Sequence, residues 1–417
     1  MSLRQPHTPP PTWSPPVRDT ETIVLAINLI TPMFGGGYEA GKVDIACPIH
    51  PAGIRGHLRF WWRATIGATY ASLESLTIAE EALWGSGDTY GAVALQVEMQ
   101  NNGRLQRCGR YEPQQDGRFR SLPTFEQDWP AYAMQPFQGK TFPDRRGIET
   151  EPSLSLLNAS FQLRLNVPAT YRNEILLALK TWILYGGLGA RTRRGCGSIA
   201  TDFAFPALDL PVSNAPELLT VLQGAHCLNV NPVNNPIIAW QRAVQLYQQF
   251  RQGVGFARNE GQERNRPGRS RWPEPDTIRT ITRQRDNRHA PMNLPYGFPR
   301  ADLGLPIIFH FQGDGDPADT TLQGGAIKQT RFASPVITKA LRLPNGMSQP
   351  TLLILNSPHV WDMGNLDLNG TPITRAQVEM TVVDRARIHP LTARGLPVRE
   401  ALVEYANAQG WTQGTLL

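Results

Sequence analysis

The spacing of apolar positions in the first half of the chain predicts four strands and two helices. Strands are indicated by apolar runs or by strict alternation of apolar and polar residues, and helices by apolar positions three and four residues apart. The expected strands cover 22–31, 91–100, 157–167 and 197–205, and the expected helices cover 51–73 and 171–186. This order, βαββαβ, is that of a ferredoxin-like domain.

The second half shows a less regular version of the same pattern. Helices are expected over 235–253 and 396–410, and strands over 303–313, 331–343 and 351–357, with no clear strand after the last helix. We therefore expect an α+β fold with two ferredoxin-like domains, a glycine-rich loop and long insertions. The expected segments are a disordered proline-rich lead at 1–20, an N-terminal domain at 21–208 and a C-terminal domain at 209–417.

Two polar stretches interrupt this pattern. Residues 101–150 are rich in Arg, Gly and Pro, which favours a long and partly ordered insertion. Residues 251–300 hold 11 arginines, no lysine and five acidic residues, with almost no apolar periodicity. That composition predicts a basic arm that becomes ordered only when it binds a partner.

Charge and cysteine content narrow the function. The 417 residues carry a net charge of +6, and 36 of the 41 basic residues are arginine, whose planar fork suits phosphate. The four cysteines are far apart and form no CxxC pair, so neither zinc nor a disulfide framework is expected, and a reducing cytoplasm fits. The lead has no apolar segment typical of a signal peptide, and no early apolar run is long enough to cross a membrane. No metal, cofactor or membrane is therefore expected.

The stretch YGGLGARTRRGCGSI, residues 185–199, combines five glycines with Arg191, Arg193 and Arg194. It lacks the lysine of a Walker A loop, and it follows a helix instead of preceding one, which argues against a nucleotide loop. A helix C-cap accounts for one or two of its glycines. A loop that holds the sugar-phosphate backbone accounts for all of them, because bare glycines such as Gly187 and Gly189 let the backbone approach phosphate while the arginines neutralise it.

The predicted helix over 51–73 supports this interpretation. Arg55, Arg59 and Arg63 recur every four residues and so lie on one helix face, about 6 Å apart along the axis. Trp62 is a candidate for stacking on a base, with burial in the core as the alternative. His57 is a candidate general acid or base, although no second histidine or carboxylate stands at a telling spacing.

These segments resemble a known family. PIHPAGIRGHLRFWWRA and GGLGARTRRGCGSI are similar to the hallmark segments of the first subunit of type III-B CRISPR effectors, the Cmr complexes, within the RAMP superfamily. GRSRWPEP, FPRADLGLPIIFHF and RFASPVI continue the resemblance to about residue 340.

The resemblance implies an RNA-binding subunit with no catalytic role, near the 3′ end of the guide RNA in RNA-guided antiviral defence. Its implied partners are the guide RNA (crRNA), the target RNA and other effector subunits. The residues carried over as RNA contacts are Arg55, His57, Arg59, Arg63, Arg191, Arg193 and Arg194, with Arg271 and Arg331 from the later segments. Two alternatives stay open: a guide-processing endoribonuclease of the same superfamily that uses His57, and a scaffold whose arginines contact acidic proteins.

Overall fold

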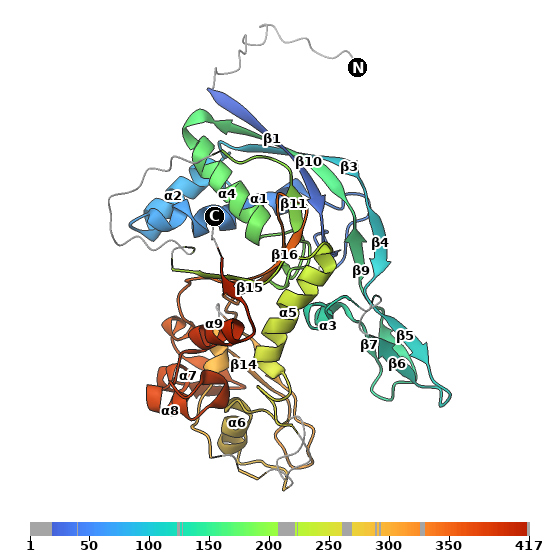
Figure 1. Cartoon of the computed structure of the whole chain (residues 1–417), viewed down its shortest axis with the longest axis vertical. Coiled ribbons are helices and arrows are strands. Elements are labelled where there is room, and N and C mark those ends of the chain that lie inside the picture. Colours follow the sequence, from blue (N-terminus) through green and yellow to red (C-terminus); the bar gives the residue numbers. More distant parts are fainter. Residues whose placement is uncertain are drawn as a thin grey trace, which may run out of the picture.

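The computed structural model describes residues 19–39, 41–122, 126, 128–206, 222, 224–260, 269–287, 290, 291, 293–325 and 330–414. The chain is an α+β protein in which an N-terminal half and a C-terminal half lie one above the other (Figure 1). Almost all of the proline-rich lead and the predicted boundary near residue 208 lie outside the described residues.

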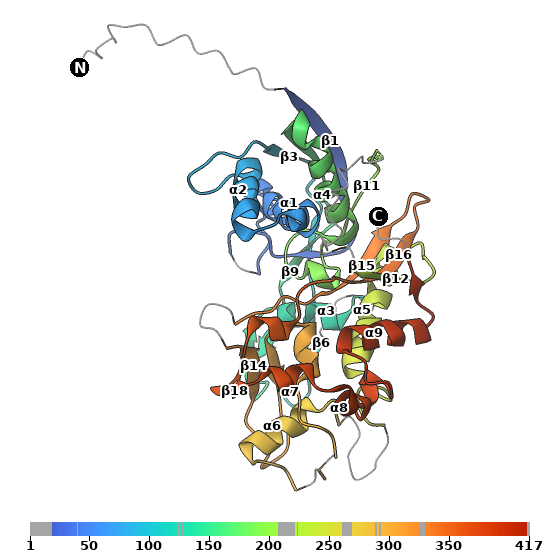
Figure 2. The ribbon, with the colours of Figure 1, turned by 90° about the vertical axis from the view of Figure 1, so that its left-hand side faces the viewer.

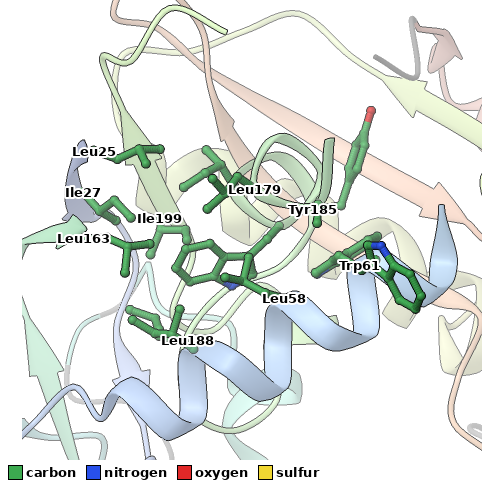
Figure 3. Close-up of a cluster of buried hydrophobic side chains, with 14 of the residues drawn as sticks. Leu25, Ile27, Leu58, Trp61, Leu163, Leu179, Tyr185, Leu188 and Ile199 are labelled. Carbon is green, nitrogen blue, oxygen red and sulfur yellow. The ribbon is translucent and has the colours of Figure 1, made fainter. Parts of the chain in front are cut away.

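The N-terminal half is built on a four-stranded antiparallel sheet. Its strand order is β11-β1-β10-β3, formed by β1 (Thr20–Leu29), β3 (Ala94–Asn101), β10 (Ser160–Pro168) and β11 (Ile199–Thr201). Alternate residues of β1 and β10 are buried, and Leu25 pairs with Leu163 in the register between these strands. Helices α1 (Pro51–Ala64) and α4 (Arg172–Tyr185) cover that face and share its apolar core (Figure 3). The four strands and two helices thus follow the order that the sequence predicts.

The helix expected over 51–73 is shorter than predicted, and a second helix that was not predicted follows it. α1 ends at Ala64, where Thr65 leaves the helical conformation and returns its hydroxyl to the Trp61 carbonyl oxygen at 2.8 Å. A second helix, α2 (Leu73–Trp84), begins after Ser72, whose side chain accepts a hydrogen bond from the backbone N–H of Ser75. The predicted helix ran too far because apolar residues continue beyond Ala64.

The insertion expected to be partly ordered is largely folded. It contributes β4 (Arg104–Arg107) to a three-stranded sheet with β2 (Met33–Phe34) and β9 (Leu154–Leu157). Two short ribbons project beyond this sheet, β5 (Arg110–Pro113) with β6 (Phe119–Leu122) and β7 (Lys140–Thr141) with β8 (Ile148–Thr150) (Figure 1). The short helix α3 (Ala131–Met134) turns back towards the main body and packs on the C-terminal half.

The C-terminal half repeats the order of the first. Its sheet has the order β15-β16-β12-β19, from β12 (His226–Asn229), β15 (Val336–Arg342), β16 (Ser348–Ile354) and β19 (Thr412–Gln413). Helix α5 (Pro236–Gln252) follows β12, and α9 (Val398–Ala408) precedes β19. The last strand, which the sequence did not reveal, is only two residues long and polar.

Both faces of this second sheet are buried. Val336, Leu352 and Ile354 pack with α5 and α9, whereas their chain neighbours Ile337 and Leu353 join the core of the N-terminal half. Because successive side chains of a strand point to opposite faces, the sheet lies between its own helices and α4 of the other half. This explains why apolar residues follow one another at 336–337 and 352–355 instead of alternating with polar ones.

A third four-stranded sheet is inserted between the elements of the C-terminal half. It has the order β13-β14-β17-β18, from β13 (Ile307–Phe309), β14 (Thr320–Gly324), β17 (Leu366–Leu368) and β18 (Thr371–Ile373). Helices α6 (Glu274–Thr282), α7 (Arg375–Glu379) and α8 (Val382–Ala386) lie in the same lower part of the molecule (Figures 1 and 2).

Candidate nucleic-acid interface

The glycine-rich loop between α4 and β11 is folded tightly against the protein itself. Leu188 points into the core beside α1 (Figure 3), and its backbone N–H donates to the Gly197 carbonyl oxygen at 2.9 Å. A Cβ on Gly189 would stand 2.3 Å from the Phe34 carbonyl oxygen, and one on Gly197 would stand 2.0 Å from the Leu188 carbonyl oxygen. Both residues have positive φ, of 76° and 65°, so close backbone packing and left-handed conformation account for these glycines.

Arg194 forms hydrogen bonds that join the two halves, and its buried guanidinium is not available to bind a phosphate. Its guanidinium donates to the Val336 carbonyl oxygen at 2.7 Å and to Ser334 Oγ at 3.1 Å, and it lies 4.5 Å from the centre of the Tyr247 ring. The residue is only 9% exposed. The prediction of Arg194 as a phosphate contact is therefore wrong, because its guanidinium N–H groups already donate to residues of the C-terminal half.

The other two arginines of the loop are half-buried. Arg193 donates to the Ser334 carbonyl oxygen and lies over the Phe60 ring, and burial, followed by the charge of Arg194, lowers its pKa to about 10. Arg191 adopts a left-handed conformation with φ of 57° and donates to the Tyr132 carbonyl oxygen at 3.3 Å. Burial also lowers the pKa of Arg191. Much of the cationic character of this loop is thus used within the protein.

The arginine stripe on α1 runs alongside α2. Arg55 donates to the Trp84 carbonyl oxygen at 2.8 Å, and Arg59 pairs with the buried Glu80 at 2.6 Å. Arg63 is 3.6 Å from the same carboxylate and keeps 48% of its side chain exposed. Arg63 is therefore the most accessible of the three cations.

Trp62 is a core residue. It is 1% exposed, and its indole N–H donates to Glu174 Oε2 at 2.9 Å. The prediction that its ring stacks on a base is wrong, because no face of the ring reaches solvent.

A cleft opens where the N-terminus of α1 meets two glycine-rich segments. It has a volume of about 290 Å³ and is lined by the first turns of α1, by the loop after β2 and by the tip of the glycine-rich loop. The lining glycines are Gly35, Gly36, Gly37, Gly41, Gly53 and Gly189. Of the predicted site residues, the structure places His57 and Gly189 in this cleft, whereas Gly187 is buried behind it.

The helix end in this cleft favours an anion. In the described chain no side chain caps the N-terminus of α1, which begins after His50 and has no acidic residue in its first turn. The backbone N–H groups of a first turn have no partner within the helix, and the helix dipole gives that end a partial positive charge. A phosphate group therefore suits the cleft physically.

The exposed ridge of α1 beside the cleft, formed by Gly53 and Gly56, carries no side chains. Gly53 and Gly56 are exposed, and a Cβ added at either position would meet no atom within 4 Å in the described structure. A glycine within a helix costs about 1 kcal/mol relative to alanine. Packing within the described chain gives no reason for this cost at either position, so the ridge is suited to the close approach of an external backbone.

Two histidines reach the cleft. Burial, followed by the charge of Lys339, lowers the pKa of His57 to about 4, which leaves the imidazole neutral at pH 7. His50 Nε2 lies 3.2 Å from Asp44 Oδ2, an ion pair when the imidazole is protonated. The sequence did not indicate His50, because only the fold brings the loop after β2 against α1. The run of glycines at 35–41 was the available signal for this part of the site.

The basic segment at 251–300 is not an arm in its described part. Arg269 forms two hydrogen bonds of 2.9 Å with Asp276, and Arg279 pairs with Asp316 at 2.8 Å. Arg271 donates to the Gly255 carbonyl oxygen at 2.6 Å and holds a local turn together. The expectation of disorder before binding is wrong for these residues, because acidic partners neutralise the arginines. Residues 261–268 lie outside the described part.

Arg331 is exposed, and its prediction as an RNA contact stays a prediction. Among the described residues, no cluster of three or more His, Cys, Asp or Glu side chains could hold a metal ion. In the same part of the chain, no helix is long and apolar enough to span a bilayer.

The family model of the RAMP superfamily matches residues 26–200. The resemblance indicated by the sequence motifs is thereby confirmed. No curated protein matches the chain in sequence.

The solved structures that are similar to the chain include the following two. The crystal structure of Cmr1 from Pyrococcus furiosus in its apo form has 14% sequence identity and a TM-score of 0.41, and the match covers 81% of this chain and 89% of that chain. A chain of the cryo-EM structure of the Type III-B Cmr-beta complex bound to cognate target RNA has 10% identity and a TM-score of 0.41. That match covers 93% of this chain and 100% of the other.

Proposed function

We propose that the chain is an RNA-binding subunit of a type III CRISPR ribonucleoprotein effector, with no catalytic role of its own. It holds guide or target RNA by the backbone near the 3′ part of the guide, alongside other effector subunits in the cytoplasm. Each half is a ferredoxin-like unit, and the cleft at the N-terminus of α1 is the RNA site. The superfamily match and the sequence motifs support the effector assignment.

The observation that carries the proposal is the bare cleft itself. It combines an uncapped helix N-terminus with glycines from two loops, and the exposed Arg63 stands outside the cleft in the last turn of the same helix. These groups contact a sugar-phosphate backbone without reading its sequence. The outward face of the N-terminal sheet offers no comparable platform, because its exposed residues, such as Asn28 and Arg164, include no aromatic ring in the described strands.

The endoribonuclease remains the second candidate because His50 and His57 share the cleft. Cleavage of RNA without a metal needs one group that removes a proton and another that supplies one. His57 does not fit the second task at neutral pH, since its pKa of about 4 keeps it unprotonated.

The test is a binding and cleavage assay on the full chain. Fluorescence anisotropy with labelled single-stranded RNAs of unrelated sequence should give similar affinities that fall steeply with salt, because bound phosphates release counterions. A denaturing gel of the same mixtures should show intact RNA. Discrete products that disappear in His57→Ala would establish the endoribonuclease instead. An absence of RNA binding, with stable capture of acidic protein subunits from the co-expressed operon, would establish the scaffold.

A further inference from the structure

Two tyrosines beside α1 are almost completely exposed. Tyr38 is 91% exposed and Tyr90 is 103% exposed, the two highest values among the large apolar side chains described. Such rings expose a large apolar area to water, and tyrosine is more often partly packed. In the described chain Tyr132, Tyr185 and Tyr247 are half-buried or buried.

The turn that carries Tyr38 belongs to the cleft. Tyr38 follows Gly37, and Gly37 and Gly41 both line the cleft. The backbone N–H of Gly37 donates to the Lys42 carbonyl oxygen at 3.1 Å, and that of Lys42 donates to the Glu39 carbonyl oxygen at 3.1 Å. These two hydrogen bonds hold Gly37 and Glu39 on either side of Tyr38, whose ring is exposed.

The turn that carries Tyr90 is held against the other side of α1. Arg55 donates to the carbonyl oxygen of Trp84, the last residue of α2, and Arg59 to that of Gly85 at 3.4 Å. A Cβ on Gly91 would stand 2.4 Å from the Gly85 backbone nitrogen, so the residue after Tyr90 is packed tightly onto this turn. Tyr90 therefore projects from a fixed backbone next to the arginine stripe.

The surroundings of both rings suit RNA better than a protein. Exposed Glu39 and Lys42 stand near Tyr38 in the chain, and exposed Asp88 and Thr89 directly precede Tyr90. The centre of a protein–protein interface is usually a contiguous apolar area with few charges. Exposed aromatic rings near basic side chains, here Tyr38 near Lys42 and Tyr90 near the arginine stripe of α1, are typical of surfaces that bind single-stranded nucleic acid.

We propose that Tyr38 and Tyr90 stack on unpaired bases of the RNA whose backbone lies in the α1 cleft, one on each side of the helix. This inference rests on the proposed function and adds base contacts to it. It makes the site selective for single strands, because paired bases are stacked on each other and offer no free face. It makes no selection among the four bases, since each has a face that stacks.

The experiment compares intact RNA with an RNA of the same length whose nucleotides are abasic, using the full chain. Both RNAs carry the same phosphates, so only the intact one reports stacking. Tyr38→Leu and Tyr90→Leu should each weaken binding of intact RNA about fivefold or more and leave binding of abasic RNA unchanged. Tyr38→Phe and Tyr90→Phe should bind as the wild type does, because the ring is kept. Tyr296→Leu is the matched control, since Tyr296 is 61% exposed but lies in the C-terminal half.

The outcomes separate this inference from the proposed function. If the wild type binds intact RNA and both leucine variants keep the full preference for intact over abasic RNA, the stacking inference is overturned while the proposed function stands. If the leucine variants bind both RNAs normally but lose a co-purified protein subunit, the tyrosines are protein contacts and the inference is again overturned. If the wild type binds neither RNA, the proposed function fails together with the inference.

Discussion

The Nζ atom of Lys339 donates a hydrogen bond to the carbonyl oxygen of Gly186, across the boundary between the two halves. Lys339 belongs to β15 of the C-terminal half and is 1% exposed, and Gly186 is the C-cap residue that follows α4. An amino group at a helix C-terminus satisfies a carbonyl that has no partner within the helix. The lysine also lies close enough to His57 for its charge to lower the pKa of that residue, so the joint between the halves lies directly behind the cleft.

Stability should depend on pH through Lys339. Burial lowers its pKa from 10.5 to about 7. Between these values the unfolded chain holds the proton and the folded chain does not, so the free energy of unfolding rises with pH across this window. Below about pH 7 the cost of burying the charge is present in full.

The measurement for this prediction is urea unfolding of wild type and Lys339→Met from pH 6 to 10. Because other groups also titrate, the difference between the two proteins is the quantity to follow. It should change in favour of the wild type as the pH rises. A difference that stays constant over this range would show that the folded lysine keeps an ordinary pKa.

Arg194→Ala should destabilise the fold. The substitution removes a buried guanidinium that holds Ser334 and Val336, and it leaves polar atoms unpaired at the joint, which costs about 2–4 kcal/mol. Arg194→Lys should not restore stability, because an ammonium group lacks the planar fork. Thermal unfolding measures the loss, with the exposed Arg331→Ala as a control that should leave Tm unchanged. An unaltered Tm in Arg194→Ala would contradict the structural role.

Substitutions of Arg63 and Arg59 should have different effects, the first on RNA binding and the second on stability. Arg63→Ala removes an exposed cation, so it should weaken RNA binding and reduce the dependence of log K on log salt by about 0.7 without changing Tm. Arg59→Ala deprives the buried Glu80 of its closer partner and should cost about 1–3 kcal/mol of stability. Anisotropy at several salt concentrations and thermal unfolding together check the pair. Equal loss of stability in both variants would contradict this difference and show that both arginines stabilise Glu80.

Asp276→Asn should unfold the region around α6 in the absence of RNA. Asp276 contacts Arg269, Arg279 and Arg285, so the substitution leaves buried cations with a weaker partner. We expect a loss of about 2–4 kcal/mol and faster amide hydrogen exchange in residues 269–286. If this region exchanges freely in the wild type and becomes protected only with RNA, the original idea of a binding arm is correct.

Much of the fold could be predicted from apolar periodicity, and the elements that were missed lack an apolar pattern. The strands of the N-terminal sheet and helices α4, α5 and α9 stand where their patterns indicate, since each has one face in a core. Strand β19 was not predicted because its two polar residues carry no apolar pattern. The charged helix α6 was not predicted because its stabilising partners, such as Asp316, are distant in sequence. Long-range ion pairs leave no local signal.

The sequence indicated the region of the candidate site, but the arginines that it indicated as the main phosphate contacts are largely buried. Sequence reasoning treated the arginines after α4 as free cations, although Arg194 is buried against strand β15. One signal was available: Lys339 is one of only five lysines and stands within an apolar strand, where a charged residue needs a buried partner. The cleft depends on the contact between the loop after β2 and α1, which a single sequence does not reveal.

The most direct test of the account is the pair of measurements on Gly56→Ala. Alanine is the better helix residue and would meet no atom within 4 Å, so the variant should be more stable by about 1 kcal/mol, with a higher Tm. If RNA backbone lies against the exposed ridge of α1, the added methyl group should weaken RNA binding at the same time. A higher Tm with an unchanged Kd for single-stranded RNA would contradict the central claim that the α1 cleft and its ridge hold RNA.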